Sequence, residues 1–584
     1  MASVHPTVVA TLAVATAGFG ILYAIYRALL PKPLPGIPYN KDSANRILGD
    51  IPEIAAVDKA GGRRRLWWME LARKHNAPIV QFFFGLGAKP GIVVADYKEA
   101  RDIMLRRGKE IIRGSINCDT FLALAPGHFL AMEDYHPDFK STRAISKDLM
   151  SSGFLNSVSG PAAYKMALNL IRLWEFKAKV ADGRPFDAGC DISHMTFDIM
   201  MAGAVGLPPS TSSTIQQLER LQASKFPCRG PVDVPTKFPK MENPALLDAI
   251  YSIEQAIGSV AGYPGAKLYH IVNNRVNPKM REALRVKIAT MKYYLTEANQ
   301  RVTRDKAGFT STCAADHLVY RVTKAAEASG TSPDLDSVAL RDSLLGYIVG
   351  GQDSTHTTLC LSVKHLSQHS DVQQNLRSAL YATHSSAYLE RRQPTVEEIT
   401  NTQIPYLDAF TQEVLRLTPP SPIVAREASV DMYILGHFIP RGTKIFLPIL
   451  GPTFQSKGWD IPERLRSETS RKQNKGFSDW ADSPYPAEEF WPERWLRPRE
   501  EDSDDGRLVY DGMMGPFMSL GSGKRGCWGQ KLAYLQQRLI ITLLVWNFEF
   551  GRLPEGSLSS WDMVEELFAK PKNTFVRIRR VWES

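Results

Sequence analysis

The stretch FMSLGSGKRGCWGQKLA, from Phe517 to Ala533, combines four glycines, three cations and one cysteine in a run that becomes helical toward its end. Its glycines permit backbone conformations with positive φ, so the loop can curl and direct amide N–H groups toward the Cys527 sulfur. Arg525 and the N-terminus of the helix expected to begin near Gly529 would both favour a thiolate. Because a thiolate is a metal ligand, the stretch predicts a cysteine-ligated metal centre. The alternative is a buried structural cysteine, which is the usual role of a lone cysteine.

The pattern L-x-x-G-x-R-x-C-x-G from Leu520 to Gly529 is similar to the haem-binding signature of the cytochrome P450 family. That family usually has Phe at the first position, so Leu520 keeps an apolar contact but loses an aromatic one. By this resemblance Cys527 is the proximal haem ligand and Arg525 meets a haem propionate. A thiolate ligand pushes electron density onto the iron and favours O–O cleavage, as an oxygenase requires. The resemblance therefore implies haem b as the cofactor and a mainly α fold with minor β sheets.

A second motif precedes the cysteine loop. Glu413 and Arg416 are three residues apart in TQEVLRLTPP, on one face of an expected helix. The same spacing recurs elsewhere in the chain, but only this pair is followed by Pro419-Pro420 and then by FWPERW, whose Arg494 can join the other two in a charge-assisted triad. We expect this triad to be structural and to hold the haem side of the fold together.

The segment GYIVGGQDSTHTTL, residues 346–359, places two adjacent glycines inside an apolar helical pattern. Each glycine costs about 1 kcal/mol relative to alanine in a helix interior, so the pair needs a reason. The segment resembles the family's oxygen-binding motif, in which the helix opens at the glycines and an acid–alcohol pair supplies protons to dioxygen. Asp353 matches the acid, and Ser354 stands where the family usually has threonine. The plain alternative is a helix kink with a capping aspartate.

Two further haem contacts follow from the resemblance alone. Arg426, in SPIVAREAS, matches the strand arginine that reaches a propionate, with a surface strand arginine as the alternative. The family's Trp-x-x-x-Arg contact is expected at His136 and Lys140 in EDYHPDFKSTR, with Arg143 as the other candidate for the cation.

An uncharged run from Thr7 to Tyr26 opens the chain. At 1.5 Å per residue it covers a hydrocarbon core of about 30 Å, so it predicts one transmembrane helix. We expect a membrane anchor at residues 1–30, a proline-rich hinge at 31–40 and a catalytic domain at 41–584. Lys and Arg follow the run and none precedes it, which places the domain in the cytosol. A cleaved signal peptide is disfavoured, because such peptides have a cationic start and a shorter apolar core.

Composition excludes several other classes of protein. With 44% hydrophobic and 23% charged residues, the 584-residue chain is neither disordered nor a multi-span membrane protein. The net charge of +10 is spread along the chain, which argues against nucleic-acid binding. The sequence contains no C-x-x-C pair, so it gives no indication of a zinc ribbon. The cysteines are also far apart, which argues against a disulfide framework. The six cysteines are Cys118, Cys190, Cys228, Cys313, Cys360 and Cys527.

Hydrophobic periodicity favours helices over strands. Helices are predicted at Tyr164–Phe176, Leu246–Ile257, Met291–Thr303, Leu340–Leu366, Val372–Thr383 and Tyr406–Leu417. Strands are predicted at Ile79–Phe84, Gly91–Val94, Met432–Leu435, Lys444–Leu447 and Phe575–Val581. The polar stretch from Gln455 to Pro486 predicts a long surface insertion.

The motifs occur in the order typical of the family, and together they predict a haem-thiolate monooxygenase with a single span in the endoplasmic reticulum membrane. By resemblance it would take electrons from NADPH through the flavoprotein NADPH-cytochrome P450 reductase and insert one atom of O2 into a lipophilic small molecule. A basic face around Lys524, Arg525 and Lys531 would suit an acidic reductase. The long insertion is similar to filamentous-fungal members of secondary-metabolite pathways.

Two other functions are compatible with the same motifs. One is a haem-thiolate isomerase or dehydratase that needs no reductase. Asp353 and Ser354 argue against this function, because such an enzyme would have no use for proton delivery to dioxygen. The other is a membrane haem protein that performs no turnover. Consumption of oxygen and NADPH with a reductase would separate all three.

Overall fold

The computed structural model describes residues 6–224, 231–304, 309–473, 480, 483–499 and 507–582. The chain forms two compact units. The first unit comprises Met1–Ile112, Ile423–Pro452 and Gly458–Lys475, and the second comprises Arg113–Pro422, Thr453–Lys457 and Gly476–Ser584. Cys228 and part of the predicted insertion, residues 474–479 and 481–482, lie outside the described residues.

A mixed five-stranded sheet forms the core of the first unit. Its strands, in spatial order, are β1 (Ile79–Phe82), β2 (Gly91–Val94), β8 (Lys444–Pro448), β5 (Ile423–Ala428) and β3 (Ile111–Ile112). Only β2 and β8 pair in parallel, and the other neighbours are antiparallel. Phe82 stacks on Phe446 at 5.0 Å, and Trp68 meets Phe446 edge-on at 4.8 Å. These fully buried rings fix the sheet against the helix that carries Trp68.

Further helices and one hairpin belong to the first unit. They are α1 (Pro6–Leu29), α2 (Ile51–Lys59), α3 (Trp67–Lys74), α4 (Tyr97–Leu105), α20 (Glu468–Gln473) and the hairpin of β6 (Met432–Ile434) and β7 (His437–Ile439).

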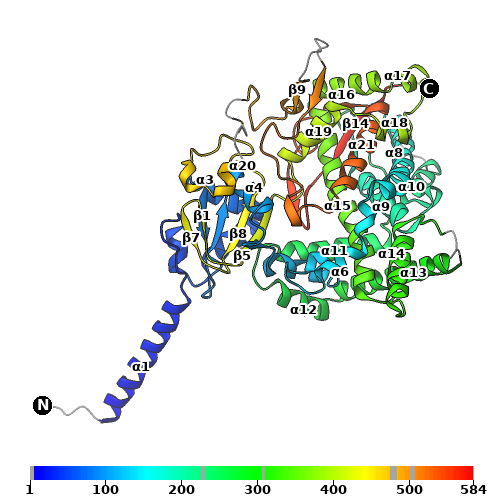
Figure 1. Cartoon of the computed structure of the whole chain (residues 1–584). Coiled ribbons are helices and arrows are strands. Elements are labelled where there is room, and N and C mark those ends of the chain that lie inside the picture. The colour runs from blue at the N-terminus through cyan, green and yellow to red at the C-terminus, as the bar shows by residue number, and fades with distance from the viewer. Residues whose placement is uncertain are drawn as a thin grey trace. The chain divides into compact units, whose positions relative to one another are not determined.

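Helix α1 extends away from the sheet of the first unit (Figure 1). Over Ala10–Leu29 it is long and apolar enough to cross a membrane, and none of that stretch is buried. Its C-terminal end is nevertheless attached to the first unit. The Tyr26 hydroxyl donates to the Asn45 carbonyl at 3.2 Å, and the Gly87 N–H donates to the Leu29 carbonyl at 3.0 Å.

The proline-rich segment that follows α1 is held along its length by one glutamine of β1. The Gln81 side chain accepts from the Leu34 N–H at 2.7 Å and donates to the carbonyls of Leu34 and Ile37 at 2.9 and 2.7 Å. The Gln81 N–H donates to the Pro38 carbonyl at 2.9 Å. Residues 34–38 therefore follow a defined path along the sheet.

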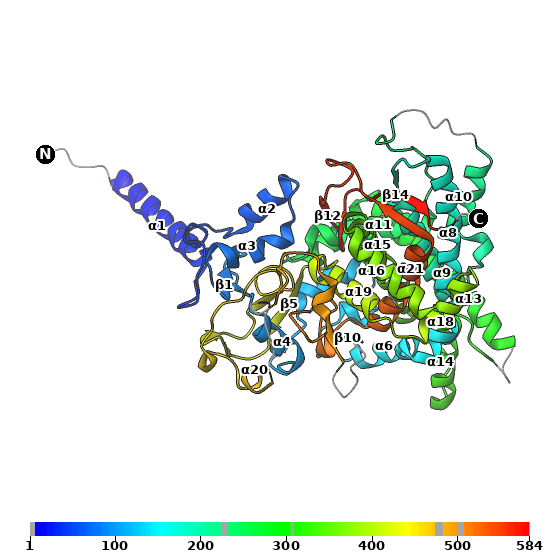
Figure 2. The same cartoon turned by 90° about the horizontal axis from the view of Figure 1, so that it is seen from above.

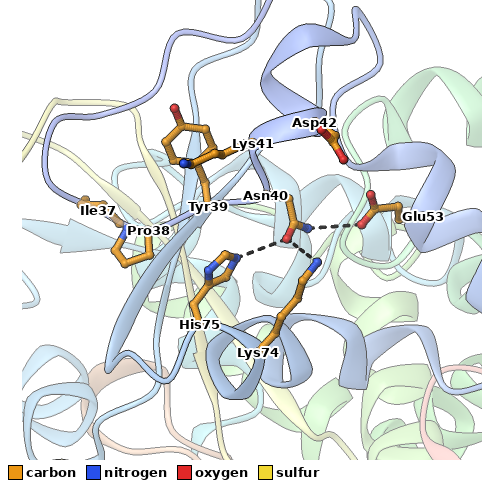
Figure 3. Close-up of a pocket in the computed structure, with 9 residues that line it drawn as sticks. All are labelled: Ile37, Pro38, Tyr39, Asn40, Lys41, Asp42, Glu53, Lys74 and His75. Carbon is orange, nitrogen blue, oxygen red and sulfur yellow. Dashed lines mark hydrogen bonds between the residues drawn. The ribbon is translucent and has the colours of Figure 1, made fainter.

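Asn40 fixes the end of the same segment. Its Oδ1 accepts from Lys74 Nζ at 2.7 Å and lies 3.2 Å from His75 Nε2, while its Nδ2 donates to Glu53 Oε2 at 3.2 Å (Figure 3). These side chains line a polar pocket of about 440 Å³.

The second unit is built mainly from helices. They are α5 (Ser115–Cys118), α6 (Phe139–Ile145), α7 (Ser152–Phe154), α8 (Gly160–Ala181), α9 (Gly189–Val205), α10 (Ser213–Gln222), α11 (Ala245–Val260), α12 (Ala266–Val276), α13 (Pro278–Arg304), α14 (Ala314–Ser329), α15 (Val338–Gln368), α16 (Ser370–Thr383), α17 (Ser385–Leu389), α18 (Val396–Thr400), α19 (Pro405–Leu417) and α21 (Gln530–Asn547). Most side chains of α15 are buried, and the helix packs on α9, α16, α19 and α21 (Figure 2).

Three small sheets complete the described part of the second unit. The largest has the order β11-β14-β4, formed by β11 (Phe548–Gly551), β14 (Phe575–Arg580) and β4 (Phe186–Asp187). Two hairpins are formed by β9 (Leu496–Pro498) with β10 (Leu508–Tyr510), and by β12 (Met563–Glu565) with β13 (Ala569–Pro571).

The predicted elements are confirmed. Each of the six segments expected to be helical lies within a longer helix, and each of the five expected strands overlaps a strand. Capping signals set the helix ends near the site. Ser337 caps α15 by accepting from the Leu340 N–H at 3.3 Å, and Pro405 is the first residue of α19, where its missing N–H costs nothing.

Candidate active site

The loop that carries Cys527 closes through backbone contacts that need glycine. Gly521 and Gly523 have φ of 63° and 69°, in the left-handed region that side chains disfavour. The Cys527 N–H donates to the Leu520 carbonyl at 2.7 Å, and a Cβ at Gly526 would lie 3.3 Å from the Gly523 carbonyl oxygen. The glycines therefore allow the tight turn that presents the thiol.

The thiol of Cys527 is solvent accessible and lies just before α21. Desolvation by the surrounding protein raises its pKa, and the Gly529 N–H lowers that pKa only in part. The sequence predicts that the loop, the helix and Arg525 together favour the thiolate, whereas the net direction in the structure is the opposite. A bound metal ion would supply the missing stabilisation, because coordination displaces the thiol proton.

Arg525 binds the neighbouring turn instead of adding charge to the thiol. Its Nε forms an ion pair with Asp134, and its Nη1 and Nη2 donate to the carbonyls of Phe129 and Met132 at 3.1 and 2.9 Å. The guanidinium carbon lies 3.9 Å from the centre of the Phe139 ring. Asp134 thus neutralises the charge that was expected to act on Cys527.

Helix α6 contacts the cysteine loop through two of its residues. His136 and Lys140 are exposed to solvent. Phe139 is buried beneath Arg525, and Arg143 Nη1 donates to the Lys524 carbonyl at 3.2 Å. Of the two cations that the sequence left open, Arg143 therefore contacts the cysteine loop, while Lys140 is exposed. The haem contacts expected at His136 and Lys140 stay predictions.

Glu413 on α19 is fully buried and accepts five hydrogen bonds. The donors are Arg416 Nε and Nη2 at 2.8 and 2.7 Å, Arg494 Nε at 2.8 Å, Trp495 Nε1 at 2.8 Å and the Trp491 N–H at 3.0 Å. Burial alone would raise the pKa of Glu413, but Arg416 and Arg494 lower it below its usual value. A network in which the carboxylate is so fully hydrogen-bonded fits a structural role for the triad. That role stays a prediction.

This network is joined to the cysteine loop by two contacts. The Trp495 ring meets Phe517 edge-on, with ring centres 6.2 Å apart. The Ser519 hydroxyl donates to the Leu415 carbonyl of α19 at 2.6 Å. The loop is thereby held on the helix that carries Glu413.

The two glycines of α15 have different surroundings. A Cβ at Gly351 would lie 2.4 Å from Met200 Sδ, so this glycine permits the close approach of α9. A Cβ at Gly350 would meet nothing within 4 Å, and Gly350 is exposed although most of α15 is buried. The Ser354 hydroxyl donates to the Gly350 carbonyl at 2.9 Å. The helix stays continuous here, and Gly350 and Ser354 form an open face on it.

Asp353 lies on another side of α15. It is fully buried, with Oδ1 2.7 Å from Lys570 Nζ and 3.7 Å from His356 Nδ1. Burial alone would raise the pKa of Asp353, but His356 and the Lys570 ammonium lower it. Successive residues of a helix point about 100° apart, so the acid and the hydroxyl do not share a face.

Comparisons with known proteins support one family for this site. The cytochrome P450 family model matches residues 54–475 and 485–577. The chain is 32% identical over 578 residues to cytochrome P450 monooxygenase TRI13 of Fusarium sporotrichioides, covering 96% of this chain and 97% of that protein. It is also 32% identical over 570 residues to cytochrome P450 monooxygenase xilC of Penicillium crustosum, covering 96% and 95%.

The chain belongs to the cytochrome P450 family. This confirms the predicted fold class and the predicted class of enzyme, a haem-thiolate monooxygenase.

The residues around Cys527 fit the haem that cytochrome P450 membership implies. An accessible thiol suits an iron ligand. Arg113 is buried, and its Nε has no hydrogen-bond partner among the residues that the structure describes. Asp134 pairs with the Arg525 guanidinium, whereas from Arg113 it accepts only the backbone N–H, at 3.4 Å. The surplus positive charge suits the propionates of haem.

Two arginines complete the description of this P450. None of the sequence motifs predicted that Arg113 contacts haem. The one signal that could have found it is its position, as a basic residue directly after the buried strand β3. Arg426 lies buried on β5 of the first unit, where its Nη1 donates to the Ala425 carbonyl at 2.9 Å. Its contact with a propionate stays a prediction.

Proposed function

We propose that this P450 is a membrane-anchored monooxygenase that inserts one atom of O2 into a lipophilic small molecule. The electrons come from NADPH through a flavoprotein reductase, NADPH-cytochrome P450 reductase. The observation that carries the proposal is the accessible Cys527 thiol, presented by a glycine turn that α19 holds in place.

Each residue has a separate task in this proposal. When bound, the haem iron supplies the redox and oxygen-activating chemistry. Cys527 would hold the haem iron through its sulfur, and the guanidiniums of Arg113 and Arg525 would hold the propionates. Ser354 positions a proton on the open face of α15, and Asp353 delivers protons from the buried side.

The reductase is proposed to dock on the side of the cysteine loop. Lys524 and Lys531 are exposed there, and the exposed Lys140 lies on α6, which contacts the same loop through Arg143. Like charges on this face would attract an acidic partner and raise the rate of encounter. Reversal of Lys524 and Lys531 to glutamate should slow reduction by the reductase and leave reduction by dithionite unchanged.

The anchor is proposed to place the protein in the endoplasmic reticulum membrane with its catalytic domain in the cytosol. The apolar surface of α1 supports this, since none of its candidate span is buried. Carbonate extraction of the full chain and of a variant without residues 1–30 provides the test. Release of the full chain into the soluble fraction would contradict the proposal.

The substrate is proposed to be an intermediate of a fungal secondary-metabolite pathway. The relatives named above come from fungi, and a further relative, 38% identical over 274 residues, is the Hps1-dma1 cluster cytochrome P450 monooxygenase of Dothistroma septosporum. Mass spectrometry of products formed on co-expression with neighbouring biosynthetic genes would identify the substrate.

The ferrous–CO spectrum tests the central assignment. Thiolate ligation gives a strongly red-shifted Soret band, which Cys527→Ala should lose. Cys190→Ala is the matched control, because Cys190 is also not fully buried and lies on α9. A variant without Cys527 that keeps the band would show that another cysteine is the ligand.

A reductase-independent isomerase or dehydratase is the second candidate. It is favoured by the separation of Asp353 from the face of Ser354, since such an enzyme needs no proton delivery to dioxygen. Turnover without NADPH consumption would establish it. A membrane haem protein without turnover would consume neither substrate nor NADPH.

A further inference from the structure

On the buried side of α15, one lysine ammonium forms ion pairs with three carboxylates. Lys570 Nζ on β13 lies 2.7 Å from Asp353 Oδ1, 2.9 Å from Glu566 Oε2 and 3.5 Å from Glu254 Oε2. The side chains of Asp353 and Glu254 are completely buried, whereas that of Glu566 is 30% exposed. Of these three carboxylates, Glu566 alone reaches solvent.

The charges in this cluster do not balance if every carboxyl is ionised. Lys570 and His356 are its two cations, against three carboxylates. Burial would lower the pKa of His356, but Cys360 and Asp353 raise it to about 10. Solvent can compensate Glu566, and both cations lie near Asp353, but an ionised Glu254 would have only a share of Lys570 at 3.5 Å, which is costly for a fully buried charge.

Glu254 on α11 is the carboxyl of the cluster whose neutral form is favoured. Burial and the charge of Asp353 raise its pKa well above the usual value of 4.5, although Lys570 opposes them. Its Oε1 has no hydrogen-bond partner within the described part of the chain. The other carboxyl oxygen of Glu254 lies 3.5 Å from Lys570, so a proton on this fully buried group would be within reach of the lysine.

Besides Cys360, which lies beside His356, Tyr251 also faces the cluster. Lys570 Nζ lies 5.0 Å from the centre of the Tyr251 ring on α11, and the Tyr251 hydroxyl is hydrogen-bonded to Ser193 of α9. Burial raises the pKa of Tyr251 to about 12, so the phenol remains neutral and adds no charge.

We propose that Glu566, Lys570 and Glu254 form the route by which solvent protons reach Asp353, with Glu254 holding one proton in reserve. The inference rests on the proposed role of Asp353 as the acid. In the resting cluster Asp353 is ionised, Lys570 is protonated and Glu254 is neutral.

The route has two stages. In the first, Asp353 takes a proton from Lys570 across 2.7 Å while Glu254 replaces that proton on Lys570, so the lysine stays protonated throughout. A solvent proton that enters at Glu566 then restores Glu254 through Lys570. For each proton that Asp353 hands on, one solvent proton is consumed, and every group regains its starting state.

Infrared spectroscopy of the full-length holoprotein tests this route without turnover. At neutral pH a protonated carboxyl absorbs apart from ionised carboxylates, so a band present in the wild type should be absent in Glu254→Gln. In D2O the same band shifts as Glu254 exchanges its proton. We expect this exchange to slow by about tenfold or more in Glu566→Gln and in Lys570→Met, because each removes a positioned proton carrier.

Two surface variants are the matched controls. Glu555→Gln and Lys572→Met change exposed residues of the same types in the same part of the chain, and both should exchange at the wild-type rate. Glu566→Gln is the decisive variant, because its side chain is partly exposed and nearly the same size, so it should fold even where Lys570→Met does not.

The possible outcomes separate this route from the proposed function. A carboxyl band that persists in Glu254→Gln, or an unchanged exchange rate in Glu566→Gln, overturns the route whatever the activity. Slow exchange in Glu566→Gln together with wild-type peroxide release in Asp353→Asn would support the route and contradict the role of Asp353. The ferrous–CO spectrum tests Cys527 independently of both.

Discussion

Glu413 and Asp353 are both buried carboxylates of the second unit, yet their surroundings are opposite. Glu413 accepts five hydrogen bonds from two arginines and two tryptophans. Asp353 shares one lysine with two other carboxylates. A carboxylate with every lone pair occupied is fixed in place, whereas a cluster short of cations must keep a proton. The first arrangement suits a structural joint and the second suits proton transfer.

The largest expected effect tests the first half of this comparison. Glu413→Ala should lower the free energy of unfolding by about 3 to 5 kcal/mol, because it leaves Arg416 and Arg494 buried without a counter-charge. Urea denaturation of the holoprotein, with haem retention as a second signal, measures it.

An exposed pair of the same spacing is the control for Glu413. Glu282 and Arg285 are also three residues apart, and they form a two-pronged ion pair at the surface. Glu282→Ala should leave the unfolding curve unchanged. Equal losses in both variants would show that the burial of Glu413 is not what matters.

The next effect concerns the second half of the comparison. Asp353→Asn should reduce product formed per NADPH consumed by about 10²-fold, because a positioned acid that supplies protons is lost. The reducing equivalents should appear as hydrogen peroxide. Ser354→Ala should act in the same direction, and the exposed Asp371→Asn serves as the control. If both site variants form as much product per NADPH as the wild type, Asp353 and Ser354 contribute only to helix packing.

A third prediction concerns the pH dependence of stability. The pKa of Glu254 is raised in the folded state, so above pH 4.5 the folded chain holds a proton that the unfolded chain has lost. This part of the stability is present below the unfolded pKa and is lost as pH rises toward the folded one. In Glu254→Gln the free energy of unfolding should therefore fall less steeply with pH, by at most about 1.4 kcal/mol per pH unit. Parallel curves for the two proteins would show that Glu254 ionises normally.

The smallest expected effect again concerns Glu413. Trp495→Phe removes one of its five donors and should lower the free energy of unfolding by about 1 to 2 kcal/mol, since four donors remain. Urea denaturation at fixed haem content measures this loss. A loss as large as that of Glu413→Ala would mean that the network fails as a unit.

The elements that the sequence predicts are those with local signals. Glycine spacing marks the cysteine loop, and helical period marks α15 and α19 before any tertiary contact is known. Glu413 and Arg416 share a helix face, so their pairing also follows from spacing.

The residues that the sequence does not predict act across long stretches of chain. Lys570 lies 217 positions after Asp353, and Glu254 lies 99 positions before it. No local pattern links such residues, because a tertiary fold brings them together.

Helix phase explains the other differences. One residue along a helix changes the direction of a side chain by about 100°, which separates Asp353 from Ser354. Spacing also left the cation on α6 open between Lys140 and Arg143, and it is Arg143 whose side chain contacts the cysteine loop.

The attachment of α1 to the first unit changes the meaning of the proline-rich segment. Ten extended residues could reach about 33 Å, yet residues 31–40 gain no such reach, because Gln81 and Asn40 hold them and Tyr26 and Leu29 fix the helix before them. If α1 tilts in a bilayer, the rest of the first unit would therefore rotate with it. An insertion or deletion between residues 31 and 40 would reorient that unit against the lipid surface instead of lengthening or shortening a tether.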